Sequence, residues 1–120
     1  YKARAEAVRH AEVYRGAFAI AVCPSENVES PTIVGAQAAN ELLNIIGIKA
    51  SFVLTEYNGK IYISSRSIDE INVQLIMERL GGGGHLNVAG AQLKDCTIVQ
   101  AKHAIMDTLD EMLKEGDIQE

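Results

Sequence analysis

Four consecutive glycines followed by a histidine, Gly81–Gly84 and His85, are the feature of this sequence best suited to chemistry. A helix end needs only one glycine for a left-handed cap, and glycine loses more conformational freedom on folding than other residues. A run of four is useful where the backbone must approach a ligand closely, because its amides can then donate to phosphate oxygens. We therefore expect an anion-binding loop, extended by the N-terminal amides of a following helical turn. His85 is placed to donate a hydrogen bond to the same anion.

The glycine run does not match the familiar nucleotide-binding loops. No Gly-Lys-Ser/Thr follows it, so it is not a P-loop, and no GxGxxG can be completed from Gly81 or Gly82. It also follows an expected helix, whereas both of those loops follow a strand. A flexible surface loop with an incidental histidine is the alternative interpretation.

An arginine on a neighbouring strand could share this anion. Alternation over residues 60–66 puts Tyr62, Ser64 and Arg66 on one face of the strand. Arginine suits phosphate because its guanidinium presents a fork of donors and stays charged. An exposed edge arginine is the alternative, but Arg66 stands shortly before the helix that leads into the glycines.

Metal and nucleophile chemistry find no support in the sequence. The three histidines match no ligand spacing, and no HExxH, paired aspartates or cysteine set occurs. The acidic residues Asp107, Asp110 and Glu111 are expected on a solvated helix face. Neither Ser64 nor Ser67 has an evident base other than His85. We expect no catalytic residue and no metal ligand in this chain.

The sequence predicts an α/β fold, with a mixed β-sheet, a β-hairpin and packed helices in a single compact domain. Helices are expected at residues 2–14, 30–47, about 70–80 and 97–116, and strands at residues 17–22, 50–57, 60–66 and 91–94. Asn58-Gly59 is the preferred two-residue hairpin turn. Thr97 and Gln100 make a capping-box pattern, and Gly116 ends that helix. The first helix has a weak apolar stripe, which favours over residues 1–14 a linker helix from an upstream domain, or a helix that packs on a part of the protein outside this sequence.

Composition limits the partners. The 120 residues include 48% hydrophobic and 22% charged residues, with a formal net charge of −5. An acidic chain is a poor binder of long nucleic acid, so an anionic ligand must be small and held locally. No stretch is long and apolar enough to span a bilayer, and no membrane contact is expected. The two cysteines form no CxxC pair, which suits a cytoplasmic setting.

Three segments together resemble the DHH-associated domain of DHH phosphoesterases. These segments are Ile63-Ser64-Ser65-Arg66-Ser67, Asn72-Val73-Gln74, and Gly81–His85 with Ala89-Gly90-Ala91-Gln92. Two less specific segments are most similar to GdpP-type cyclic-di-AMP phosphodiesterases. They are Ala50-Ser51-Phe52-Val53 and Ile76-Met77-Glu78-Arg79-Leu80. The resemblance runs from about residue 15 to 115, within an expected domain of residues 15–120.

The resemblance implies the substrate-binding half of a phosphodiesterase. In that family a separate DHH domain of the same chain holds two metal ions, usually manganese, and the associated domain closes over the nucleotide. Carried over by motif, the substrate-binding residues are Arg66, Gly81, Gly82, Gly83, Gly84 and His85, with Ser64 and Ser67 as weaker candidates. No Asp-His-His occurs here, so this chain alone is expected to be inactive and to lack a cofactor. GdpP-type relatives also carry upstream membrane helices, which implies a membrane-anchored parent.

Two other functions stay open at this point. A nanoRNase or RecJ-type exonuclease would use the same domain on short oligonucleotides. A non-catalytic module, as in alanyl-tRNA synthetases, would bind RNA or mediate dimers. The cyclic dinucleotide is favoured over a tracked strand because the chain is acidic and has only two Phe and four Tyr.

Overall fold

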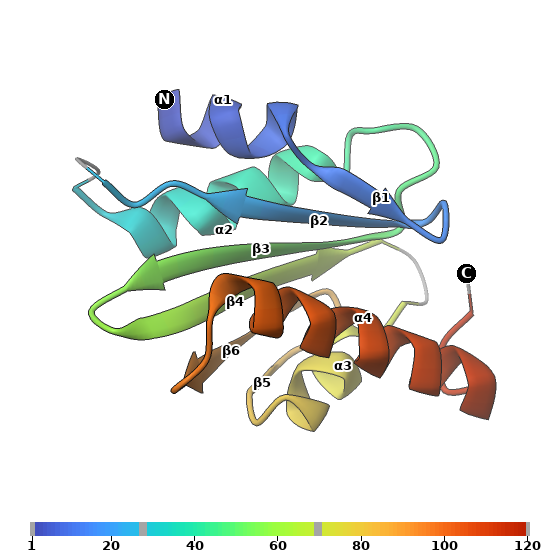
Figure 1. The fold of residues 1–120 in the computed structure, drawn as a ribbon. Coiled ribbons are helices and arrows are strands. Elements are labelled where there is room, and N and C mark those ends of the chain that lie inside the picture. The colour runs from blue at the N-terminus through green and yellow to red at the C-terminus, as the bar shows by residue number, and fades with distance from the viewer. Residues whose placement is uncertain (1, 27–28, 69–70, 120) are drawn as a thin grey trace.

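The structure is a computed structural model that describes residues 2–26, 29–68 and 71–119. Over these ranges helices and strands alternate along the chain (Figure 1). The elements are α1 Lys2–Arg9, β1 Glu12–Tyr14, β2 Phe18–Cys23, α2 Pro31–Leu42, β3 Ala50–Tyr57, β4 Lys60–Ser67, α3 Val73–Arg79, β5 Gly83–Gly84, β6 Val88–Lys94 and α4 Ile98–Glu115. No helix in these ranges has the length and apolarity needed to cross a membrane.

The strands form one mixed sheet in the order β1-β2-β3-β4-β6-β5. Among the described strands only β2 and β3 pair in parallel, because α2 provides the crossover between them, and the other neighbours are antiparallel. The predicted mixed α/β fold is confirmed.

Helices cover both faces of this sheet (Figure 1). α3 and α4 pack on one face, over a core of large side chains that includes Phe18, Phe52 and Ile105. α1 and α2 pack on the other face, where the core is made largely of alanines. Small residues let α2 approach closely: a Cβ on Gly35 would lie 2.6 Å from Thr55 Oγ1.

Local signals explain the hairpin and the last helix. Asn58 and Gly59 adopt φ of 53° and 75°, as the predicted turn between β3 and β4 requires. The Thr97 hydroxyl accepts from the Gln100 amide, and the Gln100 side chain accepts from the Thr97 amide, so the predicted capping box is present. Gly116 ends α4 with a left-handed φ of 82°.

Two predicted helix ends are wrong. The first helix stops at Arg9, and residues 12–14 form β1, which pairs with β2. α1 also packs within the domain, since Ala7 is fully buried against α2 and β2. α2 ends at Leu42, and turns fill the chain to Gly47. α3 begins at Val73, capped by Asn72, and the predicted start at residue 70 lies outside the described residues.

Candidate functional site

The face of the sheet that carries α2 is only half covered. α2 packs on β2, β3 and the near side of β4. Beyond it, Val88, Gln92 and Lys94 of β6 are exposed. On β4, the residues predicted to share one face are half-buried, while Ile61, Ile63 and Ser65 are buried beneath α3 and α4. The open surface of β4, β6 and β5 is therefore the face onto which Ser64 and Arg66 project.

Strand register arranges this open face in rows. Ser64 of β4 lies opposite Gly90 of β6, and Gly90 lies opposite Gly83 of β5. In the next row Arg66 lies opposite Val88. The His85 amide donates to the Val88 carbonyl at 2.7 Å, so His85 continues that row on the far side of Val88. The structure thus brings Arg66 and His85, 19 positions apart in sequence, to one end of one face.

Arg66 lacks a counter-charge in the described part of the chain. Its guanidinium is half-buried and donates to the Ser65 carbonyl at 2.8 Å, and no described carboxylate forms an ion pair with it. Burial lowers the pKa of the Arg66 guanidinium from its ordinary value, because desolvation disfavours the charged form. A partly desolvated cation without a counter-ion among the described residues is a favourable place for an anion.

The structure explains differently why glycine stands at each of the four positions. Gly81 needs its left-handed φ of 85°, and Cβ atoms on Gly82 and Gly84 would collide with the backbone of β6. Gly83 has an open side, with no atom within 4 Å of a Cβ placed on it. The fold explains three of the glycines, and the fourth faces open space on the surface that carries Ser64 and Gly90.

The predicted helical turn after the glycines is wrong. Gly83 and Gly84 form β5, and His85 to Val88 turn directly into β6. Because glycines have no side chains to alternate, no local pattern indicates this strand pairing.

A cleft of about 500 Å³ opens over the middle of this face. Its floor is β4 and β6, with α2 on one side and the start of the glycine run on the other. The lining residues are Thr32, Tyr62, Ile63, Ser64, Gly81, Gly82, Gly90, Ala91, Gln92 and Lys94. Ser64, Gly81 and Gly82 of the predicted site are among them, while Arg66, Gly83, Gly84 and His85 lie at the adjoining end of the same strands.

Sequence reasoning missed the β6 contribution to this cleft. Val88, Gly90, Gln92 and Lys94 alternate along the strand, and this period-two pattern was the available signal. The pattern indicates a contribution to the cleft only when the register that pairs β6 with β4 is known.

Ser67 occupies a different place from the other predicted residues. It is 6% exposed and lies on the face opposite to Arg66, as alternation along β4 demands. Its hydroxyl donates to the Ile71 carbonyl at 2.6 Å and accepts from Asn87 Nδ2 at 2.9 Å. These bonds tie the end of β4 to the turn that carries His85, so the predicted direct contact with substrate finds no support in this geometry.

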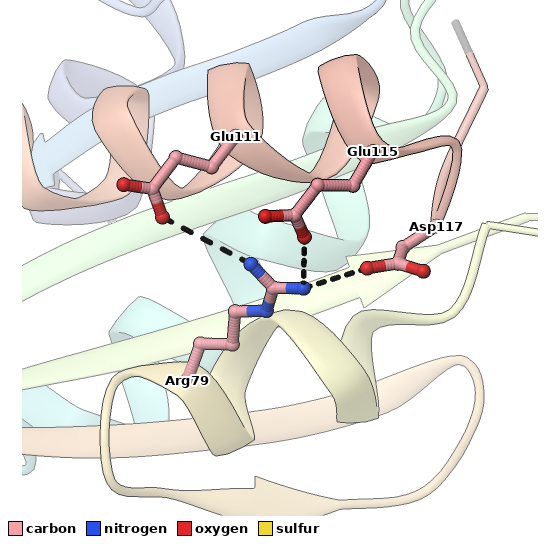
Figure 2. A network of polar contacts seen from close by, with 4 residues as sticks. All are labelled: Arg79, Glu111, Glu115 and Asp117. Atoms are coloured by element: carbon pink, nitrogen blue, oxygen red, sulfur yellow. Dashed lines mark hydrogen bonds and ion pairs between the residues drawn. The ribbon is translucent and has the colours of Figure 1, made fainter.

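A second polar cluster fixes the helix that leads into the glycines. Arg79 of α3 donates to Glu115 Oε1 and Asp117 Oδ2, both at 2.6 Å, and Glu111 lies 3.9 Å away (Figure 2). These carboxylates lie on or just after α4. Because Arg79 stands two positions before Gly81, the cluster anchors the start of the glycine run.

The acidic residues of α4 do not all lie free in solvent, as predicted for that helix face. Asp110 accepts from the Tyr14 hydroxyl at 2.7 Å and from Arg15 Nε at 2.8 Å, so it joins α4 to the β1–β2 turn. The Tyr14 hydrogen bond, followed by that of Arg15, lowers the pKa of Asp110.

Both cysteines are free thiols, Cys23 buried and Cys96 half-buried. Within the described ranges no three His, Cys, Asp or Glu side chains gather as a metal ion requires, so these residues do not fit a resident metal.

Comparison with known proteins finds relatives that are named for the same activity. The cyclic-di-AMP phosphodiesterase PdeA of Listeria monocytogenes is 45% identical over 108 residues, which is 89% of this chain and 16% of that protein. The cyclic-di-AMP phosphodiesterase GdpP of Geobacillus thermodenitrificans is 38% identical, over 97% of this chain and 18% of that protein. This chain therefore spans less than a fifth of the length of either relative.

The fold also recurs in a solved structure. An exopolyphosphatase-related protein from Bacteroides fragilis superposes with a TM-score of 0.80 at 22% identity, over 92% of this chain and 34% of the other. Residues 16–115 match the model of the DHHA1 domain. This match covers most of the chain and agrees with the resemblance in the glycine, histidine and arginine motifs, so the chain belongs to the DHHA1 domain family.

Proposed function

We propose that this domain binds the phosphodiester of a cyclic dinucleotide for hydrolysis by metals held in a separate DHH domain. The observation that carries the proposal is the row of Arg66, Val88 and His85 beside the row of Ser64, Gly90 and Gly83. It combines a half-buried guanidinium that has no ion pair with a described carboxylate, an exposed histidine and a strand surface without side chains. Phosphate oxygens can approach such a surface closely and be held from both sides.

The roles follow from chemistry and position. Arg66 neutralises a non-bridging phosphate oxygen, and His85 donates a hydrogen bond from the other side of Val88. Ser64 offers a hydroxyl at the boundary with the cleft. When bound in the DHH domain, the metals would supply the activated water. This domain supplies orientation and charge stabilisation, which matter most where charge develops in the transition state.

The relatives support a cyclic dinucleotide over the other substrates considered. Two proteins that match nearly the whole chain are named cyclic-di-AMP phosphodiesterases. The net charge of −5 disfavours a tracked RNA or DNA strand. Calorimetry should show that cyclic di-AMP binds more tightly to this chain than long RNA does. The opposite order would favour a non-catalytic RNA-binding module.

Two substitutions test the site in the enzyme that joins this domain to a DHH domain. Arg66→Ala and His85→Ala should each lower turnover of cyclic di-AMP by about a hundredfold to a thousandfold, the range typical for the loss of one transition-state donor. Both side chains are away from the core, so thermal melting should change little. Wild-type turnover in both variants would show that the site is elsewhere.

Two controls on α4 separate catalysis from folding. Asp107 is exposed and forms no hydrogen bond or ion pair with the described residues, so Asp107→Ala should change neither turnover nor stability. Leu109 is fully buried, so Leu109→Ala should lower stability by about 2–5 kcal/mol and affect turnover only through folding.

A further inference from the structure

The cleft continues past the phosphate rows to a tyrosine and a glutamine. Tyr62 of β4 lies directly opposite Gln92 of β6, and both line the cleft with Thr32 and Lys94. Tyr62 is half-buried, and Gln92 is exposed. Over the described residues, neither the Tyr62 hydroxyl nor the Gln92 amide has a hydrogen-bond partner, and Lys94 has no ion pair. This row therefore holds an aromatic ring and free polar groups that the phosphate contacts do not use.

These side chains suit a nucleobase. Tyrosine rings stack on bases of any kind, because every base has a π-face. A glutamine amide can donate to one atom and accept from its neighbour, which matches the N6/N7 edge of adenine. The Tyr62 ring is also braced by Tyr57, with centroids 6.4 Å apart and planes tilted by 50°. A braced ring loses less side-chain freedom when a base stacks on it.

The spacing suits one nucleotide unit. Successive rows on a strand face are two residues apart, or about 7 Å. The Tyr62–Gln92 row thus lies one step from the Ser64–Gly90 row and two steps from Arg66. The continuous cleft of about 500 Å³ joins the nearer rows without a side chain at Gly90 to block it.

We infer that Tyr62 and Gln92 form an adenine-base subsite, which selects a nucleotide over other phosphodiesters. This inference rests on the proposed binding of phosphate at Arg66 and His85. The base stacks on Tyr62, and Gln92 pairs with its N6/N7 edge. The sugar crosses Ser64 and Gly90 toward the phosphate.

The test uses this chain with probes that separate base from phosphate. Amide and side-chain NMR shifts are followed during titration with ribose 5-phosphate, adenosine and AMP. Ribose 5-phosphate should shift the signals of Arg66, Gly83 and His85 but not those of Tyr62 and Gln92. Adenosine should do the reverse, and AMP should shift both groups and give nuclear Overhauser contacts between its base and the Tyr62 ring.

Two variants sharpen the result. Tyr62→Leu should weaken AMP binding between about fivefold and about a hundredfold, the range for loss of one base stack, and leave ribose 5-phosphate binding unchanged. Tyr57→Leu is the matched control, since Tyr57 is a neighbouring exposed tyrosine that does not line the cleft. It should weaken AMP binding less than Tyr62→Leu does, because it removes only the brace on the Tyr62 ring and leaves the stacking ring in place.

The outcomes distinguish the two proposals. If AMP shifts only the Arg66 end, or Tyr57→Leu weakens AMP as much as Tyr62→Leu, the base subsite is wrong while phosphate binding stands. If ribose 5-phosphate shifts the Tyr62–Gln92 row instead, that row holds phosphate through Lys94, and both assignments are wrong. If no probe shifts either end at millimolar concentration, both proposals fail.

Discussion

Alanine substitutions along the glycine run should separate the glycines that the fold needs from the one that a ligand needs. A Cβ on Gly82 would lie 2.1 Å from the Gly90 carbonyl oxygen. A Cβ on Gly84 would lie 2.5 Å from the Val88 oxygen, at a φ of 147°. A Cβ on Gly83 meets nothing within 4 Å, and its φ is not positive.

The magnitudes follow from these contacts. Forcing extra volume against rigid backbone costs about 1–3 kcal/mol, which is the loss expected for Gly82→Ala. A non-glycine residue in a disfavoured φ region adds about 1–3 kcal/mol, so Gly84→Ala should lose about 2–6 kcal/mol. Gly83→Ala removes freedom from the unfolded chain without strain, so it should gain about 0.4–1 kcal/mol. In a domain of this size, 1 kcal/mol corresponds to a shift in Tm of about 3–5 °C.

Urea unfolding and thermal melts measure these differences, and titration with ribose 5-phosphate measures the site. Gly83→Ala should fold as well as the wild type and yet bind ribose 5-phosphate at least about fivefold more weakly, because its methyl group would stand beside Gly90, where the sugar crosses toward the phosphate. If Gly83→Ala is as unstable as Gly82→Ala, the β5–β6 register is wrong. If it is stable and binds normally, no ligand approaches this surface closely.

Three further predictions concern other parts of the chain. The purified chain should show no manganese-dependent hydrolysis of cyclic di-AMP, because its described residues offer no metal-ligand cluster; robust turnover by this chain would contradict the division of labour proposed above. Ser65→Ala should raise the free energy of unfolding by about 1–3 kcal/mol in urea titrations, since the Ser65 hydroxyl is buried and has no partner among the described residues; an unchanged midpoint would reveal a partner for it. The Arg79 hydrogen bond, and then its charge, lowers the pKa of Glu115 below 4.5, so this contribution to stability is full above pH 4.5 and is lost as pH falls through the lowered pKa. The Tm of the wild type should therefore fall more steeply than that of Arg79→Gln on acidification below pH 4.5, and parallel curves would exclude the ion cluster as a source of stability.

Elements with strong local signals were predictable from the sequence. The hairpin follows from Asn58-Gly59, and α4 follows from its capping box and Gly116. β1 was missed because it has three residues, two of them exposed, and forms through its pairing with β2. Such short elements depend on tertiary contacts, which no local pattern reports.

The candidate site was predictable where a side chain's identity suggests its chemistry. Arg66 and His85 were identified from residue type and motif, and the structure places them in one row. Ser67 was named from the motif alone, and the alternation along β4 places it on the buried face, opposite to Arg66. The lining residues from β6 and α2 join the cleft only through strand register and helix packing, which the sequence does not display.

The pairing of β5 with β6 changes the stage at which the glycine run becomes ordered. Ordering a residue's backbone costs about 1–2 kcal/mol, so four residues cost about 4–8 kcal/mol in all. Bonds from the Gly82 amide to the Met77 carbonyl at 2.8 Å and from the His85 amide to the Val88 carbonyl at 2.7 Å hold the run at both ends. This cost therefore falls on folding, and an arriving phosphate meets a preorganised surface. Its association rate should depend on ionic strength, through Arg66, and not on the rate of a loop closing.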